Sequence, residues 1–87
     1  MTTTVTVTLR FFASIRETIG HGSESCVTDA LDVAALRDTL IARGAPYAQA
    51  LARGKSIRMA VDQRMGDETT ALSDGAEVAF FPPVTGG

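Results

Sequence analysis

Hydrophobic and polar residues alternate strictly from Thr4 to Phe12, near the start of the chain. The apolar face of this segment is formed by Val5, Val7, Leu9 and Phe11. Alternation with a period of two, rich in β-branched residues, is typical of a β-strand that buries one face. Shorter alternating segments recur at 24–28, 56–62 and 76–81, so the sequence predicts four strands.

A helical spacing of apolar residues begins directly after Asp32. The residues on one side of this predicted helix are Val33, Leu36 and Leu40. The Asp32 carboxylate can accept hydrogen bonds from the free amides of the first turn, and Gly44 is a typical helix stop. Leu31 and Leu36 are placed to form a hydrophobic staple across this cap. The sequence therefore predicts one main helix with a well-defined start.

The remaining segments are shorter and complete the expected fold. Helical turns are expected before Gly20 and after Pro46, while 63–70 is polar and turn-like apart from Met65. The resulting order is strand, strand, helix, strand, strand. A single amphipathic helix packed on one face of a small mixed sheet is an α+β arrangement, and this is the fold class that we expect.

Length, charge and cysteine content exclude several classes of function for this chain. The chain has 87 residues, the size of one domain with a modest core. Its formal charge of −2 gives no basic footprint for nucleic acid or an anionic membrane surface. No apolar run approaches the roughly 20 residues that span a bilayer, and the first residues do not resemble a signal peptide. A single cysteine permits no internal disulfide, which favours a cytoplasmic location.

The side chains offer little material for catalysis. One histidine, one cysteine and no tryptophan argue against a metal site or a nucleophile–base pair, so we expect no catalytic residues in this chain itself. His21 is interpreted as a turn residue, Cys26 as a small buried residue, and Asp67 with Glu68 as a solvated acidic turn. Four arginines are interpreted as solvating charges, although one near the tail could meet an acidic partner: Arg10, Arg16, Arg37 and Arg58.

The six residues after Phe81 carry no charged side chain and end in two glycines. They read Pro82-Pro83-Val84-Thr85-Gly86-Gly87. The prolines cannot continue a strand and favour an extended exit, so this tail can reach roughly 20 Å from the domain. A glycine pair can thread a narrow channel and leaves the terminal carboxylate open to attack. That carboxylate needs activation, for instance as an acyl-adenylate, before it can donate an acyl group; the alternative is a simple frayed end.

The segment from Leu72 to Gly87, with its run Phe80-Phe81-Pro82-Pro83, resembles the C-terminus of the small, sulfur-carrier subunit of molybdopterin synthase. The opening Leu9-Arg10-Phe11-Phe12-Ala13, followed by Arg16-Glu17 and Gly20, is similar to the first strand and turn of that family. The likeness covers nearly the whole chain and includes Ala35-Leu36-Arg37 and Ala60-Val61. Asp62 departs from the family, which often has asparagine there, and this difference concerns the geometry of the local turn.

The resemblance implies a ubiquitin-like β-grasp domain at 1–81 and an extended tail at 82–87. In that family an adenylating, E1-like partner enzyme uses ATP to activate the terminal glycine, here Gly87, which then becomes a thiocarboxylate. The tail enters the large synthase subunit and donates sulfur to cyclic pyranopterin monophosphate, and two deliveries form the dithiolene of molybdopterin. The large subunit binds this precursor, and the complex is a heterotetramer. The chain itself is expected to bind no cofactor, nucleic acid or membrane.

Two aromatic residues define the predicted docking surface. Alternation places Phe12 on the polar face of the first strand, and Phe81 on the side opposite Val78 and Phe80. An exposed apolar patch beside the tail commonly marks a docking surface, and Met65 can join it. The family's partner surface uses apolar positions that match these three, although one ring could instead tuck into a minor second core. In the tail, Gly87 is the expected carrier, and the threading segment comprises Pro82, Pro83, Val84, Thr85 and Gly86.

Three other functions fit the same tail. The small sulfur carrier of thiamine biosynthesis shares the terminal glycine pair, but it is usually shorter and lacks the Phe-Phe-Pro-Pro approach. A ubiquitin-like modifier would instead acylate a lysine of another protein. A plain interaction module would never have its tail activated.

Overall fold

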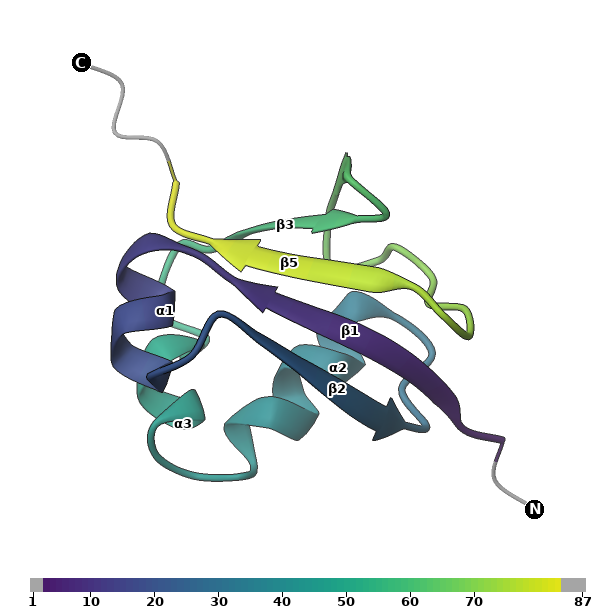
Figure 1. The fold of residues 1–87 in the computed structure, drawn as a ribbon, viewed down its shortest axis with the longest axis horizontal. Coiled ribbons are helices and arrows are strands. Elements are labelled where there is room, and N and C mark those ends of the chain that lie inside the picture. The colour runs from purple at the N-terminus through teal and green to yellow at the C-terminus, as the bar shows by residue number, and fades with distance from the viewer. Residues whose placement is uncertain (1–2, 84–87) are drawn as a thin grey trace.

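The computed structural model describes residues 3–83, which form a five-stranded sheet and three helices (Figure 1). The strands, in chain order, are β1 Val5–Phe11, β2 Ser23–Thr28, β3 Arg58–Val61, β4 Arg64–Gly66 and β5 Glu77–Phe81. The helices are α1 Ala13–Ile19, α2 Val33–Ile41 and α3 Tyr47–Ala50. All four predicted strands and the main helix are confirmed, with strand ends shifted by no more than two residues.

The sheet places the first and last strands side by side. Its order is β2-β1-β5-β3-β4. β1 and β5 run parallel in the centre, whereas the other neighbouring pairs are antiparallel (Figure 1). The predicted mixed sheet and α+β class are therefore confirmed.

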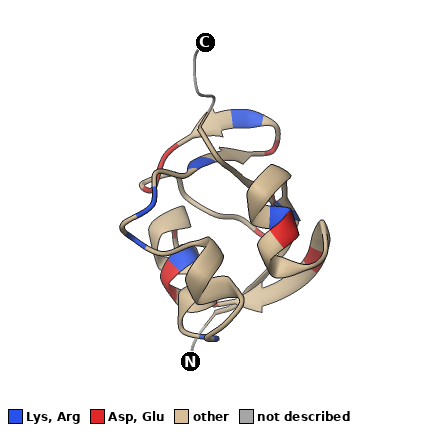
Figure 2. Cartoon of the chain, turned by 90° about the vertical axis from the view of Figure 1, so that its left-hand side faces the viewer, with Lys and Arg blue, Asp and Glu red and all other residues tan. Residues whose placement is uncertain are grey.

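One hydrophobic cluster fills the space between the sheet and the helices. Its fully buried members include Val7, Leu9, Phe11, Val33, Leu36, Leu40, Val78 and Phe80. Each such side chain contributes about 1.5–3 kcal/mol when it is removed from water. Charges of both signs lie on the helices, where basic and acidic residues occur as neighbours (Figure 2).

The start of α2 is partly as predicted. The Asp32 carboxylate accepts a hydrogen bond from the backbone N–H of Ala35 at 2.9 Å, which confirms the cap. The predicted staple is wrong, because Leu31 is 80% exposed while Leu36 is completely buried. The reason lies in the backbone: the Leu72 N–H donates to the Leu31 carbonyl at 3.0 Å. The segment before the cap thus lies extended beside Leu72, with the Leu31 side chain turned outward.

The strand β4 was not predicted, since 63–70 was expected to be a polar turn. Asp62 and Gln63 both have positive φ angles, 52° and 67°, and form a tight turn after which Arg64 pairs with Val61. Asp62 also holds this hairpin to β5, because its carboxylate accepts from the Glu77 N–H at 3.0 Å. Aspartate therefore serves this turn, and the strand was missed because three residues are too few to show an alternating pattern.

Arg37 was expected to be a solvating charge, and this is wrong. Its side chain on α2 is only 4% exposed. Its donors reach three backbone carbonyls and one carboxylate: Leu51 at 2.8 Å, Ala52 at 2.6 Å, Lys55 at 3.2 Å and Glu68 at 2.8 Å. Glu68 also pairs with Arg53 at 2.6 Å, so it is not a free acidic turn residue either. Arg37 thus ties the 51–55 loop to the loop that follows β4.

A second polar cluster surrounds Glu24 on β2. Its carboxylate accepts hydrogen bonds from the Tyr47 hydroxyl, from His21 Nε2 at 3.1 Å and from Arg43 Nη1 at 3.0 Å. Burial acts to raise the pKa of the Glu24 carboxyl, but these three hydrogen bonds outweigh burial and lower it. Cys26 lies beside this cluster, is 3% exposed and has a thiol pKa that burial raises, which confirms it as a small buried residue.

Replacing Glu24 by Gln is expected to lower the free energy of unfolding by about 1 kcal/mol at neutral pH. The glutamine oxygen can still accept hydrogen bonds, so the change removes mainly the charge. Because the folded-state pKa of Glu24 is lowered, its contribution is complete above about pH 4.5 and is lost as the pH falls through the folded-state pKa. Urea unfolding of both proteins between pH 7 and pH 3 should show the difference shrinking on acidification. A constant difference would contradict the ionic origin.

Candidate functional site

The face of the sheet away from the helices carries an apolar patch at the end where the chain leaves β5. We call the three side chains Phe12, Met65 and Phe81 the docking patch. Phe12 is 44% exposed and Met65 61% exposed, while Phe81 is half-buried. The rings of Phe12 and Phe81 meet edge to face with centroids 6.5 Å apart. The predicted exposure is therefore confirmed for Phe12 and Met65, whereas Phe81 lies on the same face but is partly covered.

Strand register explains why these residues share one face. Along β5, Val78 and Phe80 point into the core, so alternation turns Phe81 outward. Across the sheet, Ala60 of β3 pairs with Ala79 on one side and with Met65 on the other. Met65 therefore lies on the same face as Phe81. Phe12 follows β1 with an extended backbone and continues the outward series of that strand.

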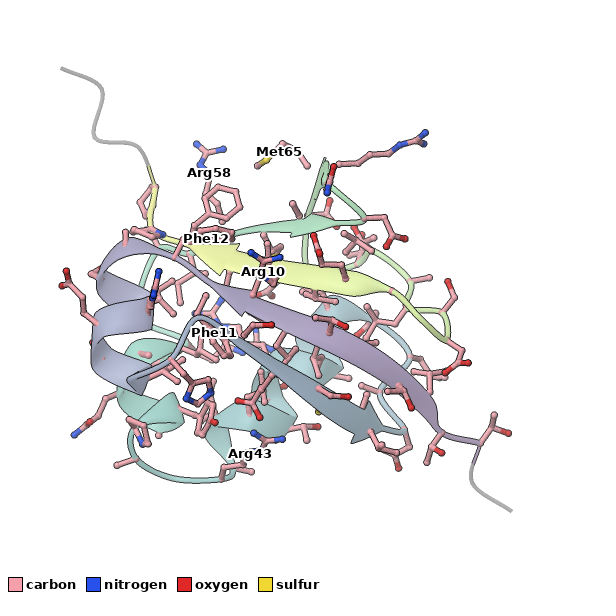
Figure 3. The ribbon with its side chains drawn as sticks, viewed as in Figure 1. Arg10, Phe11, Phe12, Arg43, Arg58 and Met65 are labelled. Carbon is pink, nitrogen blue, oxygen red and sulfur yellow. The ribbon has the colours of Figure 1, made fainter. Side chains whose placement is uncertain are left out.

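Two arginines border the docking patch (Figure 3). The guanidinium carbon of Arg10 lies 5.8 Å from the Phe12 ring centroid, a cation–π distance. Arg58 pairs with Phe81 across β3 and β5 and is exposed. Within residues 3–83, Arg58 forms no ion pair, whereas Arg10 reaches Glu77 at 3.5 Å. The patch thus combines an apolar centre with a basic rim.

An open groove of about 530 Å³ continues from the patch around the β3–β4 edge. Its lining includes Met65 of the patch, Arg58 of its rim and Pro83 of the tail, together with Lys55 and Glu68. Sequence patterns did not reveal this groove, because it depends on β4 and on the long-range contacts of Arg37.

The tail begins at this groove. Pro82 and Pro83 follow β5 and are half-buried, and Pro83 lines the groove. The remaining predicted tail residues, Val84, Thr85, Gly86 and Gly87, lie outside the described residues, so their roles in threading and in carrying sulfur stay predictions. The structure brings the docking patch to the point where this tail starts.

Residues 3–83 offer neither a metal site nor a membrane-spanning helix. In this part of the chain, no three His, Cys, Asp or Glu side chains are grouped so that they could hold a metal ion. The helices of the same region are too short and too polar to cross a bilayer.

Comparison with known proteins places this arrangement in a family. The model of the ThiS family matches residues 9–87, a span that includes the docking patch and the tail. The chain belongs to the ThiS family. It is 44% identical, over 88% of its own length and 94% of the relative's length, to the "Molybdopterin synthase sulfur carrier subunit" of Escherichia coli K12. The resemblance seen in the sequence is therefore confirmed.

Solved structures support the family's fold. The crystal structure of SAMP1 from Haloferax volcanii has a TM-score of 0.73 at 24% identity and covers 94% of this chain and 99% of that chain. A chain in the complex of subunits 1 and 2 of the molybdopterin-converting factor from Helicobacter pylori has a TM-score of 0.62 at 28% identity, covering 95% of this chain and 100% of that chain. The expected ubiquitin-like β-grasp fold is thus confirmed.

Proposed function

We propose that this protein is the sulfur carrier subunit of a molybdopterin synthase and that the carboxylate of Gly87 is its reactive group. The observation that carries the proposal is the 44% identity to the E. coli sulfur carrier subunit over 88% of the chain. The relation to a carrier found in complex with a second subunit, and a docking patch next to the tail, support it. The folded body acts as a handle that presents the tail.

The proposed reactions take place in the active sites of two partner proteins, which the tail must enter. In an activating enzyme of the E1 type, the Gly87 carboxylate oxygen attacks the α-phosphorus of ATP and releases pyrophosphate. A sulfide-level nucleophile then attacks the acyl carbon, a C–S bond forms, the C–O bond to AMP breaks, and a thiocarboxylate results. In the large synthase subunit, the thiocarboxylate sulfur forms a C–S bond to a carbon of cyclic pyranopterin monophosphate as a C–O bond at that carbon breaks. Water then attacks the glycyl carbon, the C–S bond to the glycine breaks, the sulfur stays on the pterin, and the Gly87 carboxylate is restored. Gly86 and Gly87 carry no side chains that could block these attacks.

Mass spectrometry of the protein isolated from its own cells tests the proposal. Exchange of one terminal oxygen for sulfur is the result expected for a carrier. Isopeptide conjugates to other proteins would instead indicate a modifier, and an unchanged terminus under conditions of cofactor synthesis would indicate a plain interaction module. Reconstitution with the purified large synthase subunit and the pterin precursor then separates this role from thiamine-type sulfur transfer, because only a molybdopterin carrier yields the dithiolene.

Replacing Phe81 by Ala is expected to weaken binding to the large subunit by about 10-fold to 100-fold. The ring lies on the outer face and meets Phe12, so its loss removes apolar contact from the centre of the docking patch. Titration calorimetry with the cognate large subunit measures the effect. Val27→Ala is the matched control, since Val27 is 68% exposed on the β2 edge of the same sheet, away from the patch. Equal affinities for both variants, or a large stability loss with normal binding, would contradict the docking role.

A further inference from the structure

The groove beside the docking patch has two walls that the fold holds in place. One wall is the segment 55–58, and the other is formed by Met65 and the residues that follow it. Buried Arg37 contacts both, because it donates to the Lys55 carbonyl at 3.2 Å and to the Glu68 carboxylate at 2.8 Å. The groove is therefore built in advance, which lowers the entropic cost of filling it.

The acidic residues of the groove have partners within the domain, whereas two of its basic residues do not form ion pairs there. Glu68 is paired with Arg37 and Arg53. The Asp67 carboxylate accepts from the Thr69 hydroxyl and from the Thr69 N–H, hydrogen bonds that lower its pKa. Lys55 and Arg58, by contrast, are exposed and have no ion-pair partner within residues 3–83. Within residues 3–83, the groove thus offers two cations without an ion-pair partner beside one ion-paired acid, Glu68, and one hydrogen-bonded acid, Asp67.

Apolar residues also line the groove. Ile57 is half-buried, and Met59 is 4% exposed. Met65 and Arg58 belong both to the groove and to the docking patch or its rim, and Pro83 at the start of the tail lines the same groove. A partner that covers the patch and receives the tail therefore also reaches the groove.

We infer that the groove binds a segment of the large synthase subunit that carries an aspartate or glutamate, whose carboxylate is held by Lys55 and Arg58 while neighbouring apolar atoms contact Ile57 and Met65. The identity of this partner rests on the proposed function. Charge complementarity and the continuity of the groove with the docking patch select this occupant. The contact adds a polar, register-setting interaction to a patch that is otherwise apolar.

Carbodiimide cross-linking tests directly whether Lys55 lies against a carboxylate of the large subunit. The reagent activates a carboxyl group, the Lys55 amine attacks it, and an amide bond forms as the urea leaves. Lys55 is the only lysine of the chain, so apart from the N-terminal amine it is the only site for this bond. In the purified complex we expect Lys55 joined to one acidic peptide of the large subunit. Lys55→Arg is the control, since it keeps the cation and should keep affinity while abolishing the cross-link.

Affinity measurements test the role of both cations. Arg58→Glu and Lys55→Glu are each expected to raise the Kd for the large subunit at least about tenfold. Arg64→Glu makes the same change in net charge from a position that pairs with Val61, on the side of β4 away from Met65, and should change the Kd less than about threefold. Thermal unfolding of each variant confirms that the fold is kept.

Several results would overturn the inference. A Lys55 cross-link to the tail of the chain itself would show that the groove holds its own carboxylate. If Arg58→Glu and Arg64→Glu raise the Kd by amounts that agree within twofold, the effect is long-range electrostatics only. If Arg58→Glu weakens binding and Lys55→Glu does not, the contact is confined to the rim of the docking patch. If Phe81→Ala weakens binding in the same assay while the charge reversals do not, the groove inference fails and the docking proposal stands. If none weakens binding, the docking proposal itself fails.

Discussion

An Arg37→Ala variant is expected to lose about 3–5 kcal/mol of its free energy of unfolding. The guanidinium is 4% exposed and makes four hydrogen bonds, three of them to backbone carbonyls. Removing it takes one donor from each of these carbonyls, although the Ala52 carbonyl still accepts from the Lys55 N–H at 2.9 Å, and it frees Glu68 from one of its two arginines. A domain of this size has a total stability of about 4–13 kcal/mol, so the loss amounts to between about a quarter and all of it.

Urea unfolding followed by circular dichroism measures this loss. Arg53→Ala is the matched control, because Arg53 shares the same Glu68 partner but is 42% exposed. We expect the control to lose much less than the Arg37 variant, because exposed ion pairs contribute little to stability. An Arg37→Lys variant should recover only part of the stability, since a single ammonium cannot reproduce the fork that contacts several acceptors. Equal stability of the Arg37→Ala and Arg53→Ala variants would show that the clamp is not structural.

Adding one alanine after Gly87 is expected to reduce sulfur transfer at least about 100-fold. The extension turns the Gly87 carboxylate into an amide and moves the reactive carboxylate by about 3.5 Å, beyond the alignment that a preformed site tolerates. Dithiolene formation in a reconstituted synthase is the measurement, with mass spectrometry to show that the added residue is still present. Full activity of the untrimmed protein would contradict the proposal that Gly87 is the carrier.

The extended protein also provides its own structural control. The added residue lies beyond the domain, so the free energy of unfolding should match that of the original chain. Binding to the large subunit through the docking patch should also be kept. Loss of activity with normal stability separates a defect in chemistry from a defect in folding, which the Arg37 variant cannot do.

Local patterns predicted the parts of the fold that depend on local rules. The alternation around Leu9 and the cap at Asp32 act within a few residues, so they can be recognised in one segment. Alternation also places Phe12 and Phe81 on the outer face from the sequence alone. The docking patch was therefore accessible from the sequence, although its function as an interface stays a prediction.

The missed features all depend on distant parts of the chain. Arginine is usually found at the surface. Arg37 can be buried because the carbonyls of the 51–55 loop accept hydrogen bonds from its guanidinium, and the sequence pattern does not show that these carbonyls are near. Glu68 was assigned to solvent because its two arginines lie on other elements. Leu31 was assigned to a staple, whereas pairing with the segment at Leu72 turned it outward. The groove depends on the contacts of Arg37 with Lys55 and Glu68.

The parallel pairing of β1 with β5 has a consequence for the order of events in the cell. Phe12 enters the growing polypeptide early and Phe81 almost last, yet their rings touch only after the two strands have paired. A chain in which β1 and β5 have not yet paired lacks this contact between the two rings. Under the proposed function, a partner that binds the docking patch therefore distinguishes the folded domain from an unfinished or misfolded chain.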